Sequence, residues 1–108
     1  MGGNLKISLR EAAERLAADP RPKLLDVRQQ SEYDLVRLPD AILVTDGVVE
    51  EIVQGWDRDT EIICYCHHGI RSLDAAAYLA GQGFTNVSSM NGGIDAWAKE
   101  IDPTLPQY

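Results

Sequence analysis

The chain has 108 residues, of which 44% are hydrophobic and 25% are charged, a composition typical of one globular domain. Its formal net charge of −7 argues against nucleic acid and against an anionic membrane surface as partners, because both require a basic face. A small anionic substrate is still compatible, since a pocket can be locally positive on an acidic protein. We therefore interpret residues 1–108 as a single domain with a core over about residues 5–101.

The N-terminal segment Met1–Asn4 lacks the basic and apolar stretches of a secretory signal. No apolar run approaches the roughly 20 residues of a membrane span. We expect a soluble, cytoplasmic protein without a membrane partner. In a reducing compartment, two cysteines as close as Cys64 and Cys66 are reactive, metal-binding or simply buried, rather than a disulfide framework.

The first predicted helix begins at Ser8, because Ser8 and Glu11 have the spacing of a capping box. Apolar residues then fall on one face, and the proline-rich stretch Asp19–Pro22 ends the helix. The following elements alternate between strands and short helices. In chain order, we expect a strand over Lys23–Val27, a helical turn capped by Ser31 that extends to Leu35, a strand over Ala41–Val44, and a helix over Val48–Val53.

The clearest predicted strand is Glu61–Cys66, whose apolar centre shows no alternation, as in a parallel strand covered on both faces. The later elements are a helix over about Arg71–Gln82, a strand over Val87–Met90 and a helix over Ile94–Lys99. This alternation predicts an α/β fold with a mainly parallel central sheet and helices on both faces. Ligands of such sheets bind beyond the carboxyl ends of the strands, where Cys66 lies.

The segment Cys66–Ser72 carries the strongest chemical signal in the sequence. A cysteine ends a buried strand and a short loop opens a helix, so the loop N–H groups and the helix N-terminus favour a thiolate and lower the pKa of Cys66. Gly69 permits a tight curve. Arg71 places a planar cation where an oxyanion could sit, and Ser72 can cap or orient the loop.

The pattern Cys-x-x-Gly-x-Arg-Ser after a strand resembles the active-site loop of the rhodanese family of sulfurtransferases. Two further segments are similar to signatures of that family. They are Asp26-Val27-Arg28 followed by Glu32-Tyr33, and Asn91-Gly92-Gly93 followed by Trp97. The three segments occur in the family's order and cover nearly the whole chain.

One segment departs from the family pattern. Val36–Ala41 keeps only Pro39 and Ala41 of the usual Gly-His-Ile-Pro-Gly-Ala. That segment is peripheral to the sulfur loop in the family. The departure therefore bears on partner surfaces or substrate access rather than on the fold or the loop chemistry.

The resemblance implies a rhodanese-like fold and a thiosulfate sulfurtransferase without a cofactor. In such an enzyme, the Cys66 thiolate takes sulfur from a small anionic donor such as thiosulfate and holds it as a persulfide. A thiol, an acceptor protein or cyanide then takes the sulfur. The residues implied in substrate binding follow the cysteine directly: His67, His68, Gly69, Ile70, Arg71 and Ser72.

Two other functions are weighed against this one. A non-catalytic sulfur carrier or adaptor would receive sulfur on Cys66 from a dedicated donor protein and pass it on. A phosphatase-like enzyme is disfavoured, because the ring from Cys66 to Arg71 contains six residues and the related phosphatase-type loops are one residue longer.

Cys64 lies inside the predicted strand, so we interpret it as a small core residue. A resolving thiol is the alternative, although an extended strand separates the two cysteines by about 6.6 Å, near the upper limit for a disulfide. The two cysteines and two histidines together resemble a metal cluster, but such crowded neighbours rarely converge tetrahedrally, and we assign no metal ligand. His67 and His68 are most simply exposed loop residues.

The remaining residues of the family signatures have structural interpretations. Asp26, Arg28 and Glu32 are expected to hold the fold through a salt bridge or a contact at a helix start. Trp97 is expected to anchor the core. Gly92–Gly93 is expected to let the chain turn tightly before the last helix.

Overall fold

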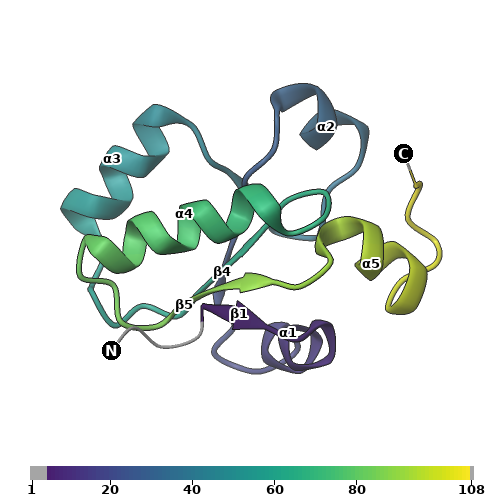
Figure 1. Cartoon of the computed structure of the whole chain (residues 1–108), viewed down its shortest axis with the longest axis horizontal. Helices are drawn as coiled ribbons and strands as arrows, with labels where there is room; N and C mark the ends of the chain where they lie inside the picture. Colours follow the sequence, from purple (N-terminus) through teal and green to yellow (C-terminus); the bar gives the residue numbers. More distant parts are fainter. Residues whose placement is uncertain (1–4, 108) are drawn as a thin grey trace.

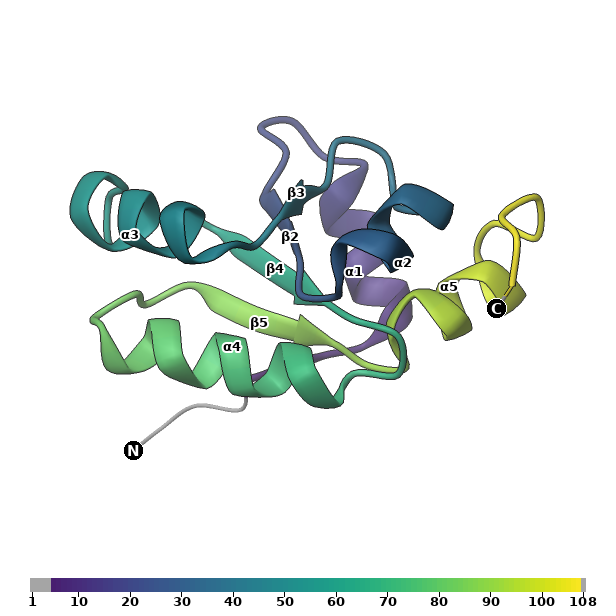
Figure 2. The ribbon, with the colours of Figure 1, turned by 90° about the horizontal axis from the view of Figure 1, so that it is seen from above.

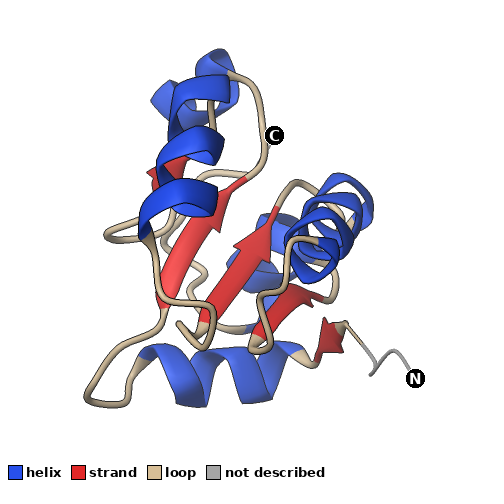
Figure 3. Cartoon of the chain, turned by 90° about the vertical axis from the view of Figure 1, so that its left-hand side faces the viewer, coloured by secondary structure: helices blue, strands red, loops and turns tan. Residues whose placement is uncertain are grey.

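Five parallel strands form the centre of the computed structural model, which describes residues 5–107 (Figure 1). The strands are β1 (Lys6–Ile7), β2 (Lys23–Asp26), β3 (Ile42–Leu43), β4 (Ile62–Tyr65) and β5 (Val87–Met90). Their order across the sheet is β1-β5-β4-β2-β3, and every pair is parallel. Figure 3 shows the longer strands pointing the same way, so their carboxyl ends meet at one edge of the sheet.

Helices follow the strands in alternation and cover both faces of the sheet. They are α1 (Leu9–Leu16), α2 (Gln30–Leu35), α3 (Asp46–Gly55), α4 (Ile70–Gly81) and α5 (Gly93–Glu100). Helix α1 lies on one side of the sheet, whereas α3 and α4 lie on the other (Figures 1 and 2). The predicted α/β class with a parallel sheet is therefore confirmed.

Strand β4 divides the core, because its side chains alternate between the two faces. Ile63 and Tyr65 pack with residues of α1 and α5, whereas Ile62 and Cys64 pack with residues of α3 and α4. All four side chains are fully buried. Burial of an aliphatic side chain of this size contributes about 1.5–3 kcal/mol, so both apolar layers fix the strand in place.

Several helix boundaries differ from those predicted. The cap of α1 is confirmed, since the Glu11 N–H donates to the Ser8 Oγ at 3.0 Å. The predicted cap of α2 is wrong, because Ser31 lies inside the helix and Gln29 is the cap residue, whose N–H donates to the Glu32 Oε1 at 3.0 Å. Helix α3 begins at Asp46, two residues before the predicted start, because the Thr45 hydroxyl caps it.

A buried ion pair holds the carboxyl edge of β2. The Arg28 guanidinium donates to both carboxylate oxygens of Asp26, at 2.8 and 2.7 Å, and both side chains are inaccessible to solvent. The Tyr65 hydroxyl also donates to Asp26, at 2.7 Å. Burial, and then this hydrogen bond, raises the pKa of Tyr65, so the phenol stays protonated. The predicted salt bridge is confirmed, and removal of one partner is expected to cost about 3–5 kcal/mol.

The atypical segment Val36–Ala41 is attached to this ion pair. The Arg28 guanidinium donates to the Val36 carbonyl, and the Leu38 N–H donates to the Tyr65 hydroxyl at 3.1 Å. Val36, Leu38 and Ala41 are buried in the core. The segment thus keeps a structural anchor although its sequence departs from the family pattern.

No helix among residues 5–107 combines the length and apolar character needed to cross a bilayer. The sequence interpretation of Met1–Asn4 concerns residues outside those described.

Candidate active site at the carboxyl edge of the sheet

Cys66 is the first residue after β4, and its sulfur lies inside a closed loop. Gly69 has a φ of 101° and lets the chain curve into α4, which begins at Ile70, one residue before the predicted start. The N–H groups of Gly69 and Ser72 point at the Cys66 Sγ, at 3.1 and 3.4 Å. The Ser72 Oγ lies 3.4 Å from the same sulfur. The loop therefore surrounds the sulfur with hydrogen-bond donors.

These donors decide the ionisation of Cys66. Burial raises the pKa of the thiol, but hydrogen bonds from the Ser72 hydroxyl and from the N–H groups of Ser72, Gly69 and Arg71 together outweigh burial. The net result is a pKa below the ordinary value for cysteine. This agrees with the direction expected from the sequence.

A second serine supports the first. The Ser72 Oγ lies 2.7 Å from the Ser89 Oγ of β5, and both residues are buried. The Ser89 hydroxyl can accept or donate, so it can fix the orientation of the Ser72 hydroxyl towards the sulfur. The sequence interpretation missed Ser89. The one feature that could have indicated it is a polar residue inside the short predicted strand, next to Met90.

The turn before α5 packs against the backbone of the cysteine loop. Gly92 and Gly93 have φ values of 76° and 63°, which confirms the predicted tight turn. A Cβ on Gly93 would lie 2.3 Å from the Cys66 carbonyl oxygen and 2.4 Å from that of His67. The N-terminus of α5 donates to these same carbonyls, from Ile94 at 2.9 Å and from Asp95 at 3.1 Å. The last sequence signature therefore positions the backbone of the cysteine loop.

Arg71 is placed at the loop by the start of α4, and it is paired with a carboxylate. Its two terminal nitrogens lie 3.0 and 3.3 Å from the two carboxylate oxygens of Glu32. The Arg71 side chain is 45% exposed. The Glu32 side chain thus makes two contacts. It accepts a hydrogen bond at the start of α2, as predicted, and it pairs with Arg71 at the candidate anion site, which the sequence did not indicate.

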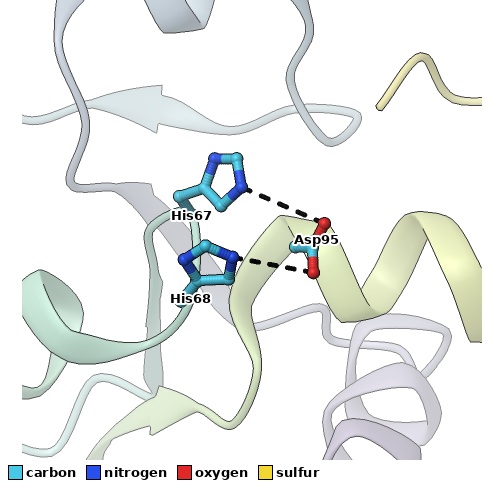
Figure 4. A group of neighbouring side chains, drawn as sticks. All are labelled: His67, His68 and Asp95. Atoms are coloured by element: carbon cyan, nitrogen blue, oxygen red, sulfur yellow. Dashed lines mark ion pairs between the residues drawn. The ribbon is translucent and has the colours of Figure 1, made fainter. Parts of the chain in front are cut away.

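His67 and His68 point towards Asp95 of α5 (Figure 4). Their Nε2 atoms lie 3.9 and 3.7 Å from the two carboxylate oxygens of Asp95. The side chain of His68 is 65% exposed, as expected for a loop residue, but that of His67 is only 17% exposed, so the prediction of an exposed His67 was wrong. Burial and the neighbouring His68 lower the pKa of His67.

The other predicted residues separate into two groups. Ile70 belongs to the loop sequence but is 76% exposed, so its side chain points away from the sulfur. Cys64 packs in the apolar layer against α3 and α4, and burial, followed by the charge of Cys66, raises its pKa to about 12. Both thiols are free of disulfides. The prediction that Cys64 is a core residue is confirmed.

The match with known families covers most of the chain. A family model described as "Rhodanese-like domain" matches residues 8–100. The chain is 35% identical over 74 residues to the thiosulfate sulfurtransferase GlpE of Pseudomonas syringae, covering 68% of this chain and 70% of that protein. It is 34% identical over 98 residues to the putative sulfurtransferase YtwF of Bacillus subtilis, covering 91% and 94%.

A longer relative contains a similar segment. The chain is 32% identical over 104 residues to the probable adenylyltransferase/sulfurtransferase MoeZ of Mycobacterium tuberculosis, but spans 26% of that protein. Among solved structures, a rhodanese-like domain protein from Staphylococcus aureus aligns with a TM-score of 0.75 at 22% identity, covering 95% of this chain and 97% of that one. A rhodanese-related protein from Thermoplasma volcanium aligns with a TM-score of 0.71 at 26% identity, covering 95% and 98%.

Proposed function

Because the chain belongs to the rhodanese-like domain family, we propose that it is a sulfurtransferase that carries sulfane sulfur on Cys66. The single observation that carries this proposal is the convergence of two backbone N–H groups and the Ser72 hydroxyl on the Cys66 Sγ. Donors arranged in this way stabilise negative charge on sulfur without having to reorganise during the reaction. A thiolate, and then a persulfide anion, fits this loop.

The first half-reaction uses a small anionic donor such as thiosulfate. The Cys66 thiolate attacks the outer sulfur of thiosulfate, a new S–S bond forms, and the original S–S bond breaks. The leaving sulfite takes the bonding electron pair, and the protein keeps a persulfide. The loop N–H groups of Gly69 and Ser72 hydrogen-bond the sulfur of the attacking thiolate.

The second half-reaction returns the protein to its starting state. A nucleophile such as cyanide or a thiolate attacks the terminal sulfur of the persulfide. The bond between the two sulfurs breaks, and its electron pair stays on Cys66 as the thiolate. Since each half-reaction regenerates a stable form of the protein, the proposal predicts ping-pong kinetics.

Arg71 is proposed to bind the sulfite portion of the donor. Its planar fork matches an oxyanion, but in this structure the fork faces the Glu32 carboxylate. The donor therefore competes with Glu32 for the guanidinium. The exposed edge of Arg71 gives the anion a place to begin that exchange.

A non-catalytic sulfur carrier or adaptor is the second candidate function. Two observations favour it: Cys66 is only 1% exposed, and a carboxylate already occupies the Arg71 fork. A protein donor that displaces Glu32 when it docks would account for both observations. This alternative keeps the Cys66 persulfide and changes the source of its sulfur.

Thiocyanate formation from thiosulfate and cyanide by the full chain distinguishes the two functions. The enzyme proposal predicts continuous turnover that is lost in Cys66→Ser and retained in Cys64→Ser. The carrier alternative predicts no turnover in wild type, with one sulfur loaded on Cys66 by a persulfidated donor protein. Loss of turnover in Cys64→Ser, with the fold intact by circular dichroism, would contradict the proposed chemistry.

A further inference from the structure

Two histidines of the Cys66 loop and one aspartate of α5 bring three side chains of metal-ligating types together (Figure 4). We call this group, His67, His68 and Asp95, the rim cluster. One donor atom from each residue lies within 4.8 Å of the other two. We propose that the rim cluster is a binding site for a divalent transition metal ion such as Zn²⁺. Imidazole nitrogen and carboxylate oxygen are established ligand types for this class of ion.

The distances in the rim cluster are somewhat longer than those between the ligands of a bound ion. With metal–ligand bonds of about 2.0–2.2 Å, neighbouring ligands of a tetrahedral ion stand about 3.3 Å apart. The His67 and His68 Nε2 atoms lie 3.9 and 3.7 Å from their nearer Asp95 oxygens. The three donor atoms lie within 4.8 Å of one another, so the widest pair has to approach by at most about 1.5 Å when an ion binds, through rotation of the side chains.

Backbone hydrogen bonds already fix the distance between the two segments that carry the rim cluster, the cysteine loop and the start of α5. The Asp95 N–H donates to the His67 carbonyl at 3.1 Å, and the Ile94 N–H donates to the Cys66 carbonyl at 2.9 Å. The close approach of Gly93 to the same carbonyls leaves no room for a side chain. Metal binding therefore requires adjustment of side chains and not of the loop.

The rim cluster differs from the crowded set considered from the sequence, because it excludes both thiols. The Cys66 Sγ faces the loop interior, where it accepts from Gly69 and Ser72. Cys64 lies in the apolar layer. Three protein ligands leave at least one coordination position for water or a small anion, as in sites with an open position.

Lys99 competes with a metal ion for the Asp95 carboxylate. Its Nζ lies 3.1 Å from the Asp95 Oδ2, one turn along α5. The Lys99 side chain is 56% exposed, so it can turn into solvent when Asp95 binds a cation. Replacement of Lys99 by a neutral residue of similar length should therefore strengthen metal binding.

Calorimetric titration of the full chain with Zn²⁺ tests the proposal. We expect one site per chain, with affinity reduced about tenfold or more in His68→Gln and in Asp95→Asn, and increased in Lys99→Met. Glu100→Gln is the matched control, since it removes a negative charge from the same helix and lies outside the rim cluster. Its affinity should equal that of wild type.

The chain contains two histidines, so any imidazole signal that Zn²⁺ perturbs in nuclear magnetic resonance spectra reports on His67 or His68. Cys66→Ser should bind Zn²⁺ as wild type does. Wild-type affinity in both His68→Gln and Asp95→Asn would overturn the proposal, as would lost binding in Cys66→Ser or no binding by wild type. These outcomes do not depend on sulfur transfer, so they leave the proposed function untouched.

Discussion

Cys64 lies inside strand β4, and Cys66 is the first residue after that strand. Cys64 contacts an apolar layer formed with α3 and α4, and its pKa rises to about 12. Cys66 is also almost inaccessible to solvent, but loop N–H groups and a hydroxyl lower its pKa. Burial alone therefore does not decide the reactivity of a thiol. The hydrogen-bond donors around the sulfur decide it.

The largest expected difference between these two regions comes from exchanging each thiol for a hydroxyl. Cys66→Ser should abolish persulfide formation, because serine supplies no thiolate. Cys64→Ser should keep sulfur transfer but lower the free energy of unfolding by about 1–3 kcal/mol, since a hydroxyl is buried in an apolar layer. Thiocyanate assays and urea unfolding of both variants check this, and equal loss of activity would make the two thiols equivalent.

The turn that supports the Cys66 loop should be the next most sensitive place. Gly93→Ala puts a methyl group against the Cys66 and His67 carbonyls at a residue with positive φ. We expect it to cost about 2 kcal/mol or more in unfolding free energy, and to lower sulfur transfer.

Gly81→Ala is the matched control for this prediction, because a Cβ there meets nothing within 4 Å. It lies at the end of α4 and should leave activity unchanged while stabilising the protein by about 0.5–1 kcal/mol. If Gly93→Ala behaved like Gly81→Ala in both measurements, the turn would not position the loop.

The serine pair should set the pH dependence of Cys66 without affecting Cys64. Ser72→Ala removes a hydroxyl that lowers the pKa of Cys66, so the pKa should rise in the variant. At a pH below that pKa, the fraction of Cys66 present as thiolate therefore falls. The alkylation rate at such a pH should drop by about tenfold, and the rate profile should move to higher pH. Ser89→Ala should move the profile in the same direction by less, because Ser89 acts through Ser72. An unchanged profile in Ser72→Ala would contradict the account.

The smallest expected effect concerns Glu32. Glu32→Gln keeps the contact at the start of α2, because glutamine also serves at this position of a capping box. It removes the charge that faces Arg71, so the KM for thiosulfate should fall by up to about fivefold, the range of an exposed ion pair. Steady-state kinetics measure this, and a higher KM would show that Glu32 helps the donor to bind.

The sequence was sufficient to predict the parallel fold and the position of Cys66 in a loop whose N–H groups face its sulfur. Apolar strands and capped helices alternate along the chain, and the loop's spacing is local to one strand–helix turn. Strand β1 was missed because it is only two residues long and, unlike the equally short β3, does not lie within a run of apolar residues.

The sequence could not predict contacts between distant elements. Ser89 reaches Ser72 only because β5 pairs with β4, and Glu32 reaches Arg71 only because the fold brings the start of α2 near the start of α4. Asp95 likewise meets the histidines through the turn at Gly93. Each of these partners lies on a different element from the loop, and no local pattern reports such pairings.

Location of the transferred sulfur tests the central claim most directly. Wild-type protein would be treated with thiosulfate, alkylated to trap persulfides, and cleaved after arginine; Cys64 and Cys66 then share the peptide between Arg58 and Arg71. Fragmentation between the two cysteines assigns the added sulfur by mass spectrometry. The account predicts one extra sulfur on Cys66 and none on Cys64. Added sulfur on Cys64 would contradict it.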